Sequence, residues 1–155
     1  MSAVVHSINI STEGGVPKLP IDKAEINFEG VEGDFNRFRT EKINSISTRA
    51  VTLFSLEQIE KLKSEGHAID VGTTGENITI EGVDWPSLKV GTRMMIGNAM
   101  IELSEPTAPC SKIGKSFIGG AFYRIDHEKE FGWSRWSASV IEEGQAEVGS
   151  QVILL

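Results

Sequence analysis

Short apolar runs, separated at close intervals by glycine, proline and asparagine, constrain the fold of this chain more than any other feature. Most of them are rich in valine and isoleucine, which is typical of β-strands. Between two of these runs lies Gly97-Asn98, which supplies the positive φ that a two-residue hairpin needs. The pattern predicts strands at Val4–Ile10, Ala24–Phe28, Ala50–Phe54, Asn77–Ile80, Arg93–Ile96, Ala99–Leu103, Ala138–Ile141 and Gln151–Leu155.

One segment has the periodicity of a helix instead. Ser55 can cap the backbone of Gln58 in a capping box, and Gly66 offers a left-handed stop. Between them, apolar residues recur at helical spacing, at Leu56, Ile59 and Leu62. Strands and helices do not otherwise alternate, which disfavours a doubly wound parallel sheet. We therefore predict an all-β fold, mainly β with one or two short helices, closed as a barrel or sandwich.

Composition limits the classes of partner. The chain has 155 residues, of which 39% are hydrophobic and 24% charged, so residues 1–155 are expected to form a single domain with a real core. Its net charge of -7 repels nucleic acid and anionic membranes. A charged amino-terminal region followed by an apolar stretch is missing, as is any long apolar run. We expect a cytoplasmic protein with neither a signal peptide nor a membrane span.

The single cysteine is the residue that most suggests chemistry. Cys110 cannot form an internal disulfide, and it follows Pro109 in a loop after a predicted strand. Lys112 and Lys115 lie nearby in the sequence and favour a thiolate, which would be a nucleophile or a soft-metal ligand. An unpaired cysteine can equally be a small buried apolar residue. Composition leaves both interpretations open.

Basic residues gather in one stretch of this acidic protein. If these residues converge on a cleft, they could bind a phosphate or a carboxylate. If they do not converge, they belong to a solvated loop. Gly75-Glu76-Asn77, by itself, reads as a tight turn entering a strand. The basic residues are Arg37, Arg39, Lys42 and Arg49.

Read in order, several segments resemble the MOSC superfamily, the family of the C-terminal domain of molybdenum-cofactor sulfurases. The resemblance covers nearly the whole chain, and its strength lies in the order of the motifs because each is short. They are Gly14-Gly15-Val16-Pro17-Lys18, Gly30-Val31-Glu32-Gly33-Asp34, the arginine-led strand from Arg49, Gly75-Glu76-Asn77-Ile78, the hairpin around Gly97-Asn98, Ala108-Pro109-Cys110, and Gly132-Trp133 to Gly149.

The resemblance implies a β-barrel-like fold and a cysteine that handles sulfane sulfur or contacts molybdenum cofactor (molybdopterin). It assigns Cys110 as a thiolate that either accepts sulfur as a persulfide or is a ligand to molybdenum. Arg49, together with Arg37 and Lys112, would bind the cofactor phosphate. Asn77 and Glu76 would shape the pocket through hydrogen bonds.

The resemblance also implies partners. Members of the family reduce N-hydroxylated compounds, so one hypothesis is an enzyme with a small N-hydroxylated or sulfur-bearing ligand and a redox partner. The other is a non-catalytic carrier of sulfur or cofactor that depends on a partner such as a cysteine desulfurase. Pyridoxal phosphate belongs to a fused domain of other members, and we expect none in this chain.

The chain departs from the family in one stretch. Members commonly have His-Gly-Gly-Pro-x-Arg before the arginine-led strand, and this chain has Asn44-Ser45-Ile46-Ser47-Thr48-Arg49. Phe35 also stands where a histidine is frequent. Losing the glycines removes a close approach of the backbone to a ligand. A third hypothesis is therefore a degenerate binding domain in which Cys110 is unreactive.

Overall fold

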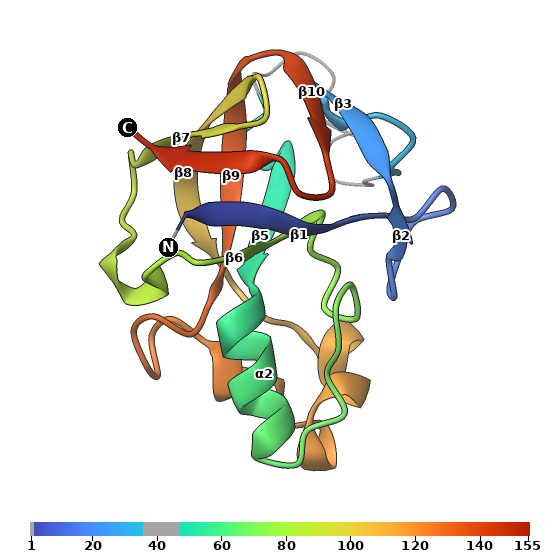
Figure 1. Ribbon diagram of the computed structural model, residues 1–155. Coiled ribbons are helices and arrows are strands. Elements are labelled where there is room, and N and C mark those ends of the chain that lie inside the picture. The colour runs from blue at the N-terminus through green and yellow to red at the C-terminus, as the bar shows by residue number, and fades with distance from the viewer. Residues whose placement is uncertain (1, 36–46) are drawn as a thin grey trace.

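A computed structural model describes residues 2–35 and 47–155 and has the mainly β architecture that the sequence predicts (Figure 1). In chain order, its elements are β1 (Ala3–Ile10), β2 (Leu19–Ile21), β3 (Lys23–Asn27), β4 (Gly30–Val31), β5 (Val51–Ser55), α2 (Leu56–Ser64), β6 (Ile78–Glu81), η1 (Trp85–Ser87), β7 (Arg93–Ile96), β8 (Ala99–Thr107), η2 (Ser111–Ser116), η3 (Ile118–Gly120), η4 (Phe122–Ile125), β9 (Arg135–Glu142), β10 (Gly144–Glu147) and β11 (Gln151–Leu154). The η elements are 3₁₀ turns.

The main sheet closes on itself as a barrel. Its strands follow the order β11, β7, β8, β9, β5, β6, β1, and β1 returns to β11 through the pairs Ala3–Val152 and Val4–Gln151. β2 extends β1 on the outside of this ring, and β10, β3 and β4 form a smaller antiparallel sheet. Closure leaves the ring strands without free edges.

The alternation of side chains along the strands explains how apolar residues fill the interior of the barrel. In β8 every second residue at the start of the strand is buried: Ala99, Ile101 and Leu103. Because successive side chains of a strand point to opposite faces, these residues share the inner face. β5 and β6 run parallel, and both contribute residues that are fully buried. The barrel interior is the hydrophobic core.

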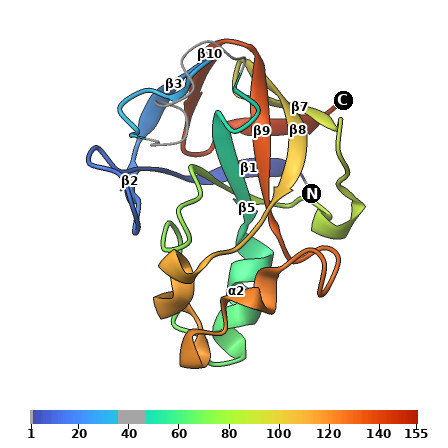
Figure 2. The same cartoon turned by 180° about the vertical axis from the view of Figure 1, so that it is seen from behind.

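Helix α2 connects the parallel strands β5 and β6. Ser55 has an extended backbone and its hydroxyl accepts the backbone N–H of Gln58 at 3.1 Å, which confirms the predicted N-cap. The Gln58 side chain donates to the carbonyl of Gly132 instead of completing a capping box. Figures 1 and 2 show α2 and the turns η2 to η4 projecting from the same end of the barrel.

The turn between β7 and β8 confirms the predicted hairpin. Gly97 has φ 59°, and a Cβ there would lie 2.4 Å from the carbonyl oxygen of Gln145. Only glycine therefore fits the close approach of β10 to this turn. All eight predicted strands overlap observed ones, although β8 continues to Thr107 and β9 begins at Arg135.

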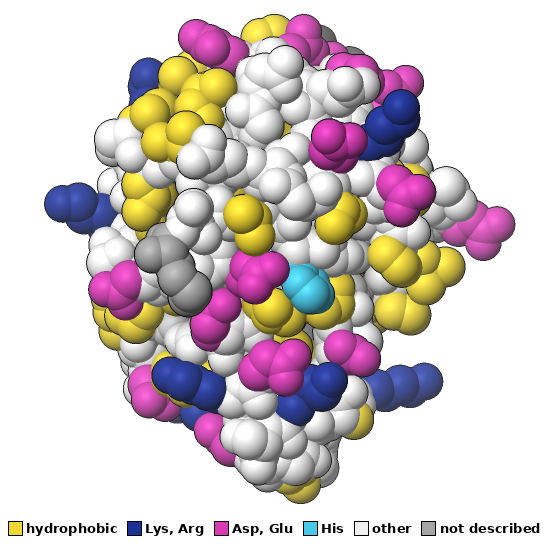
Figure 3. Space-filling view, in the orientation of Figure 1, with side chains coloured by type: hydrophobic (Ala, Val, Ile, Leu, Met, Phe, Trp, Pro, Cys, Tyr) yellow, Lys and Arg dark blue, Asp and Glu magenta, His cyan; other side chains and the backbone are white. Residues whose placement is uncertain are grey.

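The face of the molecule shown in Figure 3 is mixed. Acidic and basic side chains are interspersed on it, together with exposed hydrophobic ones. No helix among the described residues has the length and apolar character needed to cross a membrane.

Candidate functional site

Cys110 lies in the loop that follows β8, as the sequence predicts. Its thiol is free and the residue is exposed, which excludes the alternative of a buried apolar cysteine. The backbone is extended at Cys110, where η2 begins, and its carbonyl accepts the N–H of Ile113 at 3.1 Å. A thiol in this position is accessible to a ligand or a partner from solvent.

Two contacts tie the chain on both sides of Cys110 to the turn before β6. On one side, the carbonyl of Ala108 accepts a hydrogen bond from Arg135 Nη2 at 3.3 Å, and Arg135 Nη1 donates to the carbonyl of Thr74 at 2.6 Å. On the other side, the Ser116 hydroxyl donates to the Thr73 hydroxyl at 2.9 Å. The loop is therefore anchored before and after its cysteine.

Arg135 is the buried member of this arrangement. It begins β9, pairs in register with Thr107, and is 6% exposed. Its Nε atom is buried without a hydrogen-bond partner. Burial lowers the pKa of Arg135, while the negative charges of Glu76 and Cys110 act in the opposite direction. Through Ala108, the guanidinium contacts the chain two residues before Cys110.

Glu76 is fully buried and its carboxylate is surrounded by donors. Oε2 accepts the N–H of Gly72 and the hydroxyl of Thr79, both at 3.1 Å, and Oε1 accepts the hydroxyl of Thr74 at 3.0 Å. Burial raises the pKa of Glu76, and these donors oppose the rise. Glu76 therefore holds the turn in which the carbonyl of Thr74 accepts a hydrogen bond from Arg135.

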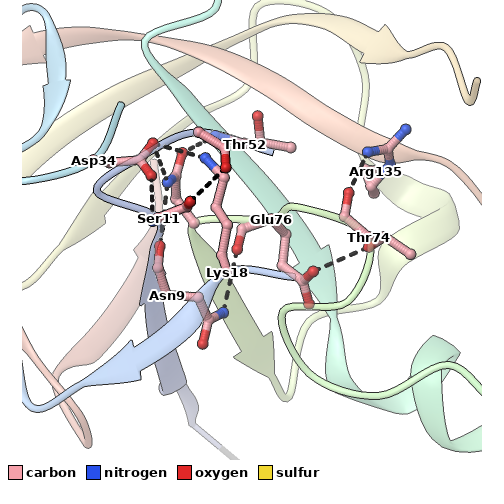
Figure 4. A network of polar contacts seen from close by, with 10 residues as sticks. Asn9, Ser11, Lys18, Asp34, Thr52, Thr74, Glu76 and Arg135 are labelled. Carbon is pink, nitrogen blue, oxygen red and sulfur yellow. Dashed lines mark hydrogen bonds and ion pairs between the residues drawn. The ribbon is translucent and has the colours of Figure 1, made fainter. Parts of the chain in front are cut away.

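Asn77 is also buried, and it joins three segments. Its Oδ1 accepts the N–H of Thr52 in β5 at 3.1 Å, and its Nδ2 donates to Asp34 Oδ2 at 3.0 Å and to the carbonyl of Asn9 at 3.3 Å. Asp34 Oδ2 also forms an ion pair with Lys18 Nζ at 2.7 Å. Figure 4 shows Asp34 and Lys18 pointing toward each other beside the segment that carries Glu76. Both predicted pocket residues are held by bonds inside the protein.

The predicted phosphate-binding cations have different positions. Arg49 lies just before β5, and its Nε forms an ion pair with Glu105 Oε1 at 2.6 Å, with both side chains nearly half exposed. Lys112 is exposed in η2, two residues after Cys110. The structure thus brings one predicted cation into the cysteine loop. Arg37, Arg39 and Lys42 lie outside the described residues, as do Asn44, Ser45 and Ile46 of the divergent segment.

Sequence reasoning missed Arg135 and did not assign roles to Asp34 and Lys18. The last two lie in motifs that the sequence analysis singled out. Arg135 stands between Ser134 and Trp136 in a stretch that mixes serine with apolar residues, and nothing in that stretch marks a buried cation. Across the described residues, no group of three or more His, Cys, Asp or Glu side chains is placed to hold a metal ion.

Solved structures of similar fold come from several bacteria. YiiM from Geobacillus stearothermophilus has a TM-score of 0.75 and 22% identity, covering 99% of this chain and 75% of that one. YiiM from Escherichia coli has a TM-score of 0.73 and 20% identity, covering 100% and 70%. The YUAD protein from Bacillus subtilis has a TM-score of 0.71 and 17% identity, covering 98% and 94%. At these identities the likeness establishes the fold.

Sequence comparison gives the family. The uncharacterized protein YflK of Bacillus subtilis (strain 168) is 28% identical over 81 residues, which are 52% of this chain and only 36% of the length of YflK. Residues 33–153, which include the Cys110 loop, Arg135 and the Glu76 turn, match the MOSC domain, and the chain therefore belongs to the MOSC domain family.

Proposed function

We propose that this MOSC protein binds molybdenum cofactor and that the Cys110 thiolate is a ligand to the molybdenum. The supporting observation is a free, exposed thiol in a loop that is anchored on both sides. Thiolate is a soft donor, and a ligand atom must be accessible and held in place. Cys110 meets both conditions.

The residues present fit the cofactor better than a bare metal ion. Within residues 2–35 and 47–155 there is no cluster of three or more metal-ligating side chains, so Cys110 would add one sulfur to a metal already held by the pterin. When bound, the cofactor would supply a redox-active molybdenum for reduction of a small N-hydroxylated compound.

The other predicted residues would bind the cofactor phosphate or shape the pocket around it. Arg49 is partly exposed and can exchange Glu105 for a phosphate, since guanidinium binds both through the same fork of N–H groups. Lys112 would add a point charge next to Cys110, and Arg37 would contribute a further cation. Glu76 and Asn77 would act indirectly by holding the turn and strand behind the loop, because their polar atoms are already bonded within the protein.

Reconstitution with isolated molybdenum cofactor tests this proposal. After removal of unbound cofactor, molybdenum and pterin are measured in the wild type, in Cys110→Ser and in Ser111→Ala, a control at the exposed neighbouring residue. We expect the wild type and the control to retain molybdenum, and Cys110→Ser to lose at least about tenfold of its affinity. Equal retention of molybdenum by Cys110→Ser would contradict the proposal.

A second candidate function is a sulfur carrier. Exposed apolar side chains at Ile118 and Tyr123 follow the cysteine loop and would offer contacts to a donor protein such as a cysteine desulfurase. The Cys110 thiolate would attack the terminal sulfur of the donor persulfide. A new S–S bond forms at Cys110, the donor S–S bond breaks, and the donor thiolate leaves with no net redox change. In a reducing cytoplasm, the persulfide on Cys110 would then transfer its outer sulfur to an acceptor.

Sulfane sulfur separates the two candidates. After exposure to a persulfide donor, cyanide-labile sulfur on the wild type and its absence from Cys110→Ser would favour the carrier, provided that neither binds molybdenum. Turnover of an N-hydroxylated base by reconstituted protein with a reductant would favour the enzyme.

A further inference from the structure

The outer face of the barrel carries a row of apolar side chains across β11, β7 and β8. Met95 of β7 lies between Ile153 of β11 and Met100 of β8, and it is paired with both in the strand register. The residue that precedes each of these three in its strand is buried in the core, so the three side chains point outward. Ile153 is 45% exposed, and the two methionines are partly exposed.

The apolar row belongs to a larger exposed patch. Leu155 follows β11, is 64% exposed, and donates its backbone N–H to the carbonyl of Arg93 in β7. In Figure 3, hydrophobic side chains gather at the upper left, over β7 and the end of β11. Contiguous apolar surface of this kind is typical of an interaction site, and methionine is among the residues enriched there.

Two opposite charges border the apolar row. Arg93 of β7 and Glu102 of β8 are paired in register, and Arg93 Nε lies 2.9 Å from Glu102 Oε1. Each is two residues from a methionine of the row, so the charged pair and the apolar row share the outer face. The side chains of Arg93 and Glu102 are 49% and 36% exposed. Both are therefore accessible to charges on another molecule.

The arrangement of these pairs makes the face complementary to itself. A two-fold axis that runs along the strands, between β7 and β8, exchanges the positions of the two strands. In a second copy placed face to face across that axis, Met95 meets Met100 and Arg93 meets Glu102. Sheets that pack face to face keep their strands aligned within about 30°, which this placement satisfies. Opposite charges then meet where the apolar rows cover each other.

We propose that the outer face of β11, β7 and β8 is a docking surface for a second copy of this chain, which binds as a symmetric dimer. Charge complementarity identifies the occupant. With a net charge of -7, two copies repel each other in most orientations, and the exchange of Arg93 with Glu102 provides a contact in which they attract. The face is small for a stable interface, so we expect a dissociation constant on the order of 10 to 100 µM.

The proposed dimer leaves the candidate functional site open. Figures 1 and 2 show β7 and the end of β11 well away from the turns η2 to η4, the first of which follows Cys110. A copy seated on the outer face therefore does not cover the cysteine loop. The inference goes beyond the proposed function and does not depend on it.

Sedimentation velocity between about 5 and 500 µM protein tests the inference. The variants are the single charge reversals Arg93→Glu and Glu102→Arg, and the double variant that combines them. Each single reversal places like charges opposite each other across the axis, and the double variant restores opposite charges. Lys61→Glu, at an exposed residue of α2, changes the net charge as much as Arg93→Glu does and is the matched control.

We expect the wild type and the Lys61→Glu control to dimerise over this range. Each single reversal should weaken the dimer at least about tenfold, and the double variant should return to within about threefold of the wild type. Ile153→Glu should also dissociate the dimer, because it places a charge in the apolar row and leaves Arg93 and Glu102 unchanged. Circular dichroism checks that each variant folds, and Ile153→Glu decides if a charge reversal does not.

Three outcomes overturn the inference. A wild type that stays monomeric up to about 500 µM would mean that a second copy does not bind this face. A dimer that persists in Ile153→Glu and in both single reversals would use another surface. A folded double variant as weak as the single reversals would mean that Arg93 and Glu102 do not meet across the axis. None of these results involves molybdenum or Cys110, so they are distinguishable from failure of the proposed function.

Discussion

Substitution of Asn77 by aspartate tests the buried polar contacts that hold the candidate site. The two side chains have the same shape, and the new carboxylate can still accept the N–H of Thr52. On the other side, however, an amide that donates to Asp34 and to the carbonyl of Asn9 becomes a second acceptor. The variant therefore places two carboxylates against each other away from water.

The expected loss follows from these contacts. A hydrogen bond to a charged group contributes about 1.5 to 3 kcal/mol and one to a carbonyl about 0.5 to 1.5 kcal/mol. Repulsion between the carboxylates adds to this loss, and Lys18, at 2.7 Å from Asp34, offsets part of the repulsion. We expect Asn77→Asp to lower the free energy of unfolding by about 3 to 5 kcal/mol near pH 7.

Denaturant unfolding measured by circular dichroism checks this value. Asn98→Asp, which makes the same change at an exposed residue, is the control and should alter stability by less than about 0.5 kcal/mol. The deficit of Asn77→Asp should shrink as the pH falls, because one carboxyl of the facing pair takes up a proton. Equal stability of the two variants near pH 7 would refute the assigned role of the Asn77 amide.

Three further predictions concern stability. Glu76→Gln should lower the free energy of unfolding less than Glu76→Leu does, because leucine leaves three donors unsatisfied at about 1 to 3 kcal/mol each. Equal losses of stability in denaturant unfolding would contradict this. Hydrogen bonds from Arg124 lower the pKa of Glu65 below its ordinary value of 4.5, so this pair stabilises the fold at pH values above 4.5. The stabilisation is lost as the pH falls through the lowered pKa. Arg124→Met should therefore flatten the dependence of melting temperature on acidic pH. Gly72→Ala would place a Cβ 2.2 Å from the carbonyl oxygen of Lys18, so it should destabilise far more in thermal melts than Gly149→Ala, which has a similar φ and open space.

Local patterns predicted the barrel strands because those strands carry their own signal. The β7–β8 hairpin has apolar runs on both sides of a glycine turn, and the observed strand β7 has the predicted bounds. β10 was missed because Gly144–Glu147 lacks the branched apolar residues of a strand and forms by pairing with β3. The turns η2 to η4 were missed because 3₁₀ turns lack the 3.6-residue repeat of an α-helix.

The candidate site was only partly predictable, for a related reason. Cys110 stands out as the one cysteine, and its place after a strand can be read locally. Arg135 depends on Thr74 and Ala108, which are 61 and 27 residues away in sequence, so no local pattern marks its burial. A polar residue at the start of a strand ordinarily faces water, and only the tertiary structure shows that this one does not.

X-ray absorption at the molybdenum K-edge tests the central claim most directly, since it counts the sulfur atoms bound to the metal. It is applied to protein reconstituted with molybdenum cofactor, as the wild type and as Cys110→Ser. If the Cys110 thiolate is a ligand, the wild-type spectrum contains one more molybdenum–sulfur bond than that of the variant. Identical sulfur coordination in the two proteins would contradict the account.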